Sequence, residues 1–157
     1  MRAVPSGDKG VVCLSRYSSR PTVRICPIRQ CARGLELARS LGSKVVAVHV
    51  SAPFHVLAGT LAALTATREE WEQDAAAFNQ KVFERVAAMA RDLGVACTCV
   101  SCTGEHVWQQ IIQAAEANGC DAICMASHGR RGFAAVMLGS ETAKVLTHTK
   151  IPVVVLR

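Results

Sequence analysis

The chain has 157 residues, half of them apolar, which is enough to bury one sizeable core and too few for two ordinary domains. Its net charge of +6 belongs to the N-terminal part, because residues 1–43 hold eight lysines or arginines against Asp8 and Glu36, while the rest of the chain is balanced at ten basic and ten acidic side chains. Without a basic recognition helix, a secretory signal or an apolar run of the roughly 20 residues that span a bilayer, the chain is expected to be cytoplasmic, with no nucleic-acid or membrane partner.

Residues 1–30 are irregular in sequence. Two short apolar groups, Val11–Leu14 and Val23–Ile28, are both candidates for a first strand. Pro27 disfavours the second group, because proline cannot donate to a central ladder. The abrupt change of texture near Cys31 raises the hypothesis that the preceding residues derive from a frame shift, a mis-called start or a divergent replacement. If so, the sheet lacks its usual central strand.

From residue 30 onward, apolar periodicity predicts alternating helices and strands. A first helix ends at Gly42, and a long helix opens with a capping box at residues 67–70 and ends at Gly94. The core-facing positions of the two helices are Cys31, Leu35, Ala38 and Leu41, then Trp71, Ala75, Phe78, Val82, Val86, Met89 and Leu93. A third helix starts near Trp108 and ends near Asn118-Gly119, and a last one covers residues 140–148.

Apolar, β-branched runs predict strands at residues 44–50, 95–102, 122–125 and 151–156. Strands that alternate with helices indicate a parallel α/β sheet, in which ligands bind beyond the carboxyl ends of the strands at the switch in strand order.

The eight cysteines are expected to be reduced, because the chain is an ordinary globular length and lacks a secretory signal. Cys97, Cys99 and Cys102 form a C-x-C-x-x-C pattern that offers thiolates to a soft metal. The same period-two spacing fits a buried strand. We favour the structural role and keep the metal site as the alternative.

The stretch from Met125 to Ser140 is the main candidate site. A buried strand leads into Gly129, the arginines at 130 and 131, and Gly139-Ser140, which opens a helix with a serine cap. Glycines let backbone approach a phosphate, and a helix start attracts anions. His128 has no catalytic partner at a suitable spacing, and P-loop and dinucleotide motifs are absent, so no catalytic or metal-binding residues are predicted.

These residues resemble the signature of the universal stress protein family: Ala126, two residues, Gly129, nine residues, then Gly139-Ser140. The resemblance runs from about Cys31 to Arg157 and includes Gly34–Arg39, His49-Val50, Gly104-Glu105 and the closing run 151–156. It implies one domain, residues 1–157 with residues 1–30 divergent. The implied α/β fold is a five-stranded parallel sheet flanked by helices on both faces, Rossmann-like and similar to the adenine nucleotide alpha hydrolases.

The resemblance also implies a stress-response protein that binds ATP or AMP, with Mg²⁺, and acts as a regulatory dimer. Any ATP hydrolysis is expected to be slow and incidental. The backbone of Val50 would read adenine, Ala126 would lie near the ribose, and the later glycines would wrap the phosphates. The implied nucleotide-binding residues are Val50, Ala126, His128, Gly129, Arg130, Gly139, Ser140 and Glu141.

Two departures from the family pattern define an alternative. Ala126 replaces the first glycine, and residues 1–31 contain no Asp-Gly-Ser-like turn. The alternative is a dimeric interaction module of the same family that binds no nucleotide. In either case the family commonly dimerises through the last strand, where an unpaired apolar edge favours association. The expected homodimer edge comprises Val153, Val154, Val155 and Leu156.

Overall fold

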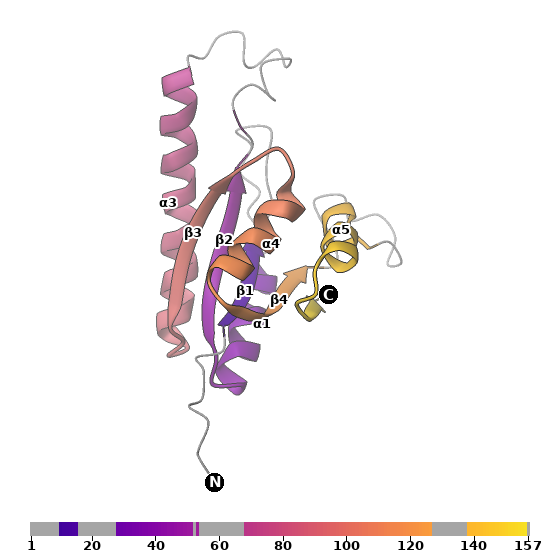
Figure 1. The fold of residues 1–157 in the computed structure, drawn as a ribbon. Coiled ribbons are helices and arrows are strands. Elements are labelled where there is room, and N and C mark those ends of the chain that lie inside the picture. The colour runs from indigo at the N-terminus through magenta and orange to yellow at the C-terminus, as the bar shows by residue number, and fades with distance from the viewer. Residues whose placement is uncertain (1–9, 16–27, 52, 54–67, 127–137, 157) are drawn as a thin grey trace.

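The computed structural model describes residues 10–15, 28–51, 53, 68–126 and 138–156 (Figure 1). Helices and strands alternate along these ranges, as the periodicity predicted. The elements are β1 (Gly10–Ser15), α1 (Ile28–Ser40), β2 (Lys44–Ser51), α3 (Arg68–Asp92), β3 (Cys97–Thr103), α4 (Val107–Ala117), β4 (Cys120–Ala126), α5 (Ser140–His148) and β5 (Val153–Leu156).

The strands form a parallel sheet in the order β3-β2-β1-β4-β5. The chain moves outward from β1 through β2 to β3, and then crosses to the other side of β1 for β4 and β5. The switch in strand order therefore lies between β1 and β4. The α/β class with helices and parallel strands is confirmed.

The first of the two apolar groups near the N-terminus supplies the central strand. In the register, Val12 of β1 pairs with Val46 on one side and with Ile123 on the other. The second group ends inside α1, which begins at Ile28. The central strand that the frame-shift hypothesis would remove is present, because β1 forms ladders with both β2 and β4.

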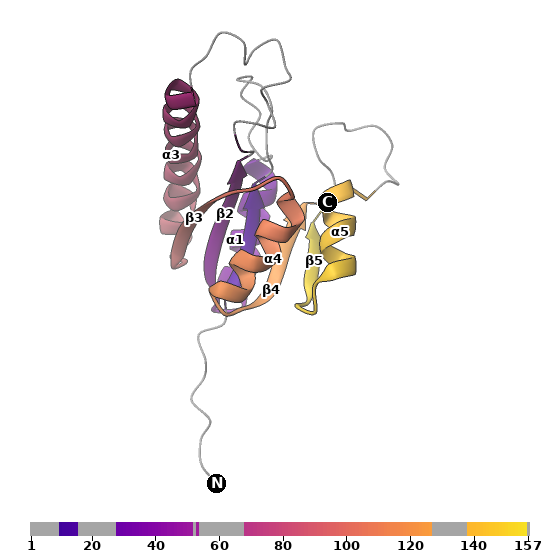
Figure 2. The same ribbon diagram turned by 45° about the horizontal axis from the view of Figure 1, so that its top comes forward.

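In the described part of the chain, α4 and α5 lie on one face of the sheet, and α1 and α3 lie on the other. Figure 2 shows α4 in front of the strands and α1 behind them. The larger core cluster joins residues of α4 and α5 to one face, with Val48, Ile111 and Ile123 among its members, and the second joins α1 and α3 to the other face around Leu35, Val45 and Cys124. Neighbouring residues of β2 serve opposite clusters, which explains why its apolar run is continuous.

Two of the predicted helix stops depend on glycine. Gly42 and Gly94 have φ angles of 61° and 67°, a region in which side chains with a Cβ are strained. The residue after each glycine donates its backbone N–H back into the helix, Ser43 to Ala38 at 2.8 Å and Val95 to Ala90 at 2.8 Å. These bonds satisfy carbonyls that the helix end leaves unpaired.

The same turns correct two predictions. Leu41 was assigned to the core-facing stripe but is 63% exposed, because α1 ends at Ser40 and the turn carries Leu41 outward. Val95 is buried, yet its N–H closes the end of α3, so β3 begins two residues later. The predicted capping box of the long helix lies outside the described residues at Thr67 and at the side chains of Arg68 and Glu70, as does the side chain of Trp71.

None of the helices in the described part of the chain combines the length and the hydropathy that crossing a bilayer requires.

Candidate functional site

The strands are parallel, so their carboxyl ends meet at one edge of the sheet. These ends are Ser51 of β2, Thr103 of β3, Ala126 of β4 and Leu156 of β5. The ladder between β1 and β2 ends at the pair Ser15 and His49, whereas β2 and β3 stay paired up to Ser51. Val50 and Ala126 thus lie on the two strands that flank β1, beside the switch in strand order, where open α/β sheets bind ligands.

Val50 can offer a ligand only its backbone. Its side chain is fully buried in the core cluster under α4. The predicted role of the Val50 backbone in reading adenine stays a prediction. Ala126 is half-buried, and its carbonyl oxygen accepts a hydrogen bond from Thr142 Oγ1 at 3.0 Å.

The helix start at Gly139-Ser140 lies where the motif predicted it, but the cap is a different residue. Gly139 is the N-cap, with φ −60° and ψ 142°, and Ser140 is the first residue of α5. The predicted serine cap is therefore wrong. The Ala143 N–H donates to the Gly139 carbonyl at 2.9 Å, so the amides of residues 140–142 precede the first intrahelical bond. They lie at the positive end of the helix dipole.

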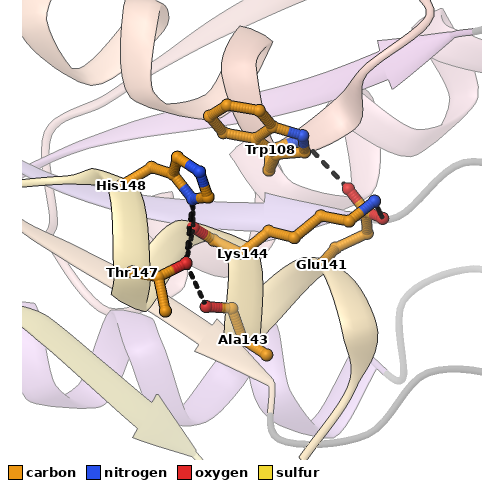
Figure 3. A network of polar contacts seen from close by, with 6 residues as sticks. All are labelled: Trp108, Glu141, Ala143, Lys144, Thr147 and His148. Carbon is orange, nitrogen blue, oxygen red and sulfur yellow. Dashed lines mark hydrogen bonds and ion pairs between the residues drawn. The ribbon is translucent and has the colours of Figure 1, made fainter.

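Glu141 contacts another helix. Its Oε2 accepts a hydrogen bond from the backbone N–H of Trp108 at 3.1 Å, and its Oε1 lies 3.4 Å from Lys144 Nζ (Figure 3). The N-cap of α4, His106, makes no side-chain capping bond. The carboxylate of Glu141 therefore supplies the start of α4 with a side-chain acceptor, which the N-cap His106 does not provide.

A ring contact joins the same two helices. The rings of Trp108 and His148 lie 4.3 Å apart between centroids, and Figure 3 shows them side by side. His148 Nδ1 lies 2.8 Å from the Lys144 carbonyl oxygen. The contacts through Glu141 and His148 thus tie α5 to α4 at both ends of the shorter helix. Sequence reasoning missed Thr142 and Trp108, because no motif marks the contact of Thr142 with β4 or of Trp108 with α5.

Three predicted site residues, His128, Gly129 and Arg130, lie outside the described residues, as does Arg131.

A second polar group lies at the same edge of the sheet, on the face covered by α3. His49 is 4% exposed and packs against the rings of Phe78 and Phe83 at centroid distances of 5.8 and 6.4 Å. Burial lowers the pKa of His49, so the ring is neutral, and its buried Nδ1 has no hydrogen-bond partner among the described residues.

Asn79 of α3 joins the ends of two strands next to His49. Its Nδ2 donates to Ser101 Oγ at 2.9 Å and to Ser51 Oγ at 3.4 Å. The longer bond is the weaker one. Asn79 therefore fastens α3 to β2 and β3 close to the carboxyl edge.

The C-x-C-x-x-C thiols do not converge. Cys97 packs against the cluster under α1 and α3, whereas Cys102 packs against the cluster under α4, on the other face of β3. Burial and the neighbouring thiol of Cys99 raise the pKa of Cys97 to about 12, which disfavours the thiolate that a metal needs. Within the described ranges, no group of three or more histidine, cysteine or acidic side chains is arranged to hold a metal ion.

The last strand is an edge of the sheet. β5 pairs with β4 from Val153 to Leu156, and the order of strands leaves its other side unpaired within the described sheet. Val154 is 36% exposed, and Leu146 of α5 is 41% exposed.

Comparison with known proteins identifies the family. Residues 29–157 match the universal stress protein family, so the chain belongs to that family, as the signature around Gly139 indicated. No curated protein sequence matches the chain.

Solved structures share the fold at low sequence identity. The universal stress protein UspA from Lactobacillus plantarum is 18% identical, with a TM-score of 0.70 over 96% of this chain and 98% of that chain. A universal stress protein from Archaeoglobus fulgidus in complex with dAMP is 18% identical, with a TM-score of 0.60 over 95% and 98%. A family protein from Arabidopsis thaliana with AMP bound is 20% identical, with a TM-score of 0.60 over 94% and 90%.

Proposed function

We propose that this protein binds an adenine nucleotide, AMP or ATP, at the carboxyl edge of its sheet and acts in the cytoplasm as a regulatory stress-response dimer. One observation carries the proposal. The start of α5 is bonded to the carboxyl end of β4 through Thr142 and Ala126, directly beside the switch between β1 and β4. Relatives with this fold have AMP or dAMP bound, and both ligands join an adenine base to a single phosphate.

Different elements of the described structure would contact different parts of the nucleotide. The backbone of Val50 would face the base, since its side chain is buried. Ala126 would lie near the ribose, and the amides after Gly139 would face the phosphate. Helix starts bind phosphate through unpaired N–H groups and the dipole. ATP would bring Mg²⁺ with its phosphates, and AMP needs no metal.

The second candidate function is a dimeric interaction module that binds no nucleotide. The carboxylate of Glu141 in the first turn of α5 favours it, because it already balances the dipole that would attract a phosphate. The exposed edge at Val154 supports a dimer under either function, formed by pairing of β5 with a second copy.

Calorimetric titration distinguishes the two functions. The purified protein is titrated with AMP, with ATP and Mg²⁺, and with GMP as the control for base recognition. Saturable heat with AMP or ATP and little with GMP supports the nucleotide site. Absence of heat with both adenine nucleotides refutes it and favours the interaction module.

Light scattering after size exclusion tests the dimer. The parent is expected to have twice the mass of one chain, and Val154→Lys is expected to be monomeric, because a lysine on an edge strand blocks pairing. Leu41→Lys, at an exposed position far along the chain from β5, is the matched control and should stay dimeric. A monomeric parent at micromolar concentration contradicts the dimer.

A further inference from the structure

Two consecutive residues in the first turn of α5 bond to two different elements. Glu141 reaches the start of α4, and Thr142 reaches the end of β4. Successive residues of a helix point about 100° apart, so one turn can contact both neighbours at once. We call Glu141 and Thr142 the α5 clamp.

The Thr142 bond is buried. Thr142 is 4% exposed, and its hydroxyl donates to the carbonyl of Ala126, the last residue of β4. The ladder between β4 and β5 also ends at Ala126, where it pairs with Leu156. The Thr142 hydroxyl thus adds a hydrogen bond to the last residue of β4 and fixes the position of α5 relative to the end of that strand.

The Glu141 bond uses charge as well as geometry. The carboxylate lies in the first turn of α5 and at the start of α4, so it interacts favourably with both helix dipoles. Its two oxygens are engaged, one by the Trp108 N–H and one by Lys144. The side chain is 18% exposed, so this arrangement is partly shielded from water.

We propose that the α5 clamp is a positioning pair, which holds the start of α5 in register with the carboxyl end of β4 so that the amides after Gly139 can receive a phosphate. The inference rests on the proposed function. It assigns Glu141 a role different from the nucleotide contact expected from the family resemblance, because its oxygens face Trp108 and Lys144. Neither clamp residue touches the nucleotide.

The test uses paired substitutions in the full chain. Thr142→Val removes the hydroxyl at constant shape, and Thr142→Ser keeps it. Glu141→Ala removes the acceptor for the Trp108 N–H, and Glu141→Gln keeps it. Ser40→Ala is the matched control, because Ser40 Oγ also donates to a carbonyl, that of Leu37 at 2.8 Å, but within α1.

AMP affinity of the folded variants is the first readout. Thr142→Val and Glu141→Ala are each compared with the variant that keeps the bond, and each is expected to bind AMP about tenfold or more weakly than that variant, Thr142→Ser or Glu141→Gln. Thr142→Ser should also stay within about threefold of the parent, whereas Glu141→Gln serves as the reference for Glu141→Ala because both lose the same negative charge from the first turn of α5. Ser40→Ala should not change the affinity for AMP. A merely structural role would lower the melting temperature of the first two variants without changing the affinity of the protein that remains folded, and this result would overturn the proposal.

Amide hydrogen exchange is the second readout and needs no nucleotide. Glu141→Ala, but not Glu141→Gln, should accelerate exchange of the Trp108 amide, and Thr142→Val, but not Thr142→Ser, should accelerate exchange of the Ala143 amide at the start of α5. If the parent binds no AMP, the proposed function is refuted. The hydrogen-exchange rates then test by themselves whether the α5 clamp holds the start of the helix in place. Unchanged exchange at both amides refutes the clamp whether or not AMP binds.

Discussion

Replacing Gly139 by aspartate should stabilise the protein and at the same time weaken its binding of a nucleotide. Gly139 is the N-cap of α5, with φ −60° and ψ 142°, which any residue can adopt. No side-chain capping bond is present there. A carboxylate would accept a bond from an amide of the first turn and would interact favourably with the helix dipole. The variant should therefore fold, and its effect on binding can be read without backbone strain.

The two effects have opposite signs and different sizes. Capping is worth a few tenths of a kcal/mol over glycine and the dipole about 0.3–1, so the melting temperature should rise by about 2–4 °C. A phosphate with about two negative charges, held roughly 5 Å from the new carboxylate at an effective dielectric of about 40, would lose about 3 kcal/mol, or about a hundredfold in affinity.

Gly139→Asn is the matched control, since asparagine caps nearly as well with the same shape and no charge. Both variants are compared with the parent by thermal melting and by titration with AMP. The difference in AMP affinity between the aspartate and asparagine variants should become smaller in high salt, which screens the repulsion between the carboxylate and the phosphate. Equal AMP affinity of the aspartate and asparagine variants would refute the reasoning, because the phosphate would then lie away from the start of α5.

Three further predictions concern the stability of the scaffold. Burial lowers the pKa of His49 from its ordinary 6.5, so the stability that the neutral ring provides is present above about pH 6.5 and is lost as the pH falls through the lower pKa of the folded state. Between pH 7 and pH 5, the urea midpoint of His49→Leu should therefore fall less than that of the parent. An equal fall in the two proteins would count against this effect of His49. A Cβ on Gly104 would lie 2.8 Å from side-chain atoms of Gln110, so Gly104→Ala should cost about 1 kcal/mol, and Gln110→Ala should restore most of it in a double-mutant cycle. Ile123→Ala, at a position with no exposed surface, should lower the free energy of unfolding by about 3–4 kcal/mol in denaturant titrations. Leu41→Ala, at a position that is 63% exposed, should lower it by less than about 0.5 kcal/mol. Similar losses for the two variants would contradict the described core.

Local patterns were sufficient where one element decides the outcome. The β-branched run of β2 predicted a strand covered on both faces, and its burial confirms this. The spacing of Cys31, Leu35 and Ala38 predicted the buried stripe of α1, since side chains three and four residues apart share a helix face. The same pattern failed at Leu41, because periodicity does not mark the residue at which the helix ends.

The candidate site was only partly readable from the chain. The signature placed Gly139 and Ser140 at a helix start, but assigned the cap to the serine. The family resemblance assigned Glu141 to the nucleotide, which stays a prediction, but the resemblance gave no sign that its carboxylate bonds to the start of α4. Thr142 carried no signal, because a single threonine in a helix has no pattern that names its partner.

The sequence by itself determined the alternation of helices and strands, the helix stops and the family, because these follow from periodicity, backbone preference and a spaced motif within one chain segment. Only the tertiary structure decided which apolar group became β1, which face each cysteine of β3 occupies, and how the first turn of α5 is bonded to both β4 and α4. Those outcomes depend on contacts between segments far apart in the chain, such as Trp108 with Glu141 and Ala126 with Thr142. Local propensity does not specify such contacts, since each arises only when the packed sheet brings its partners together.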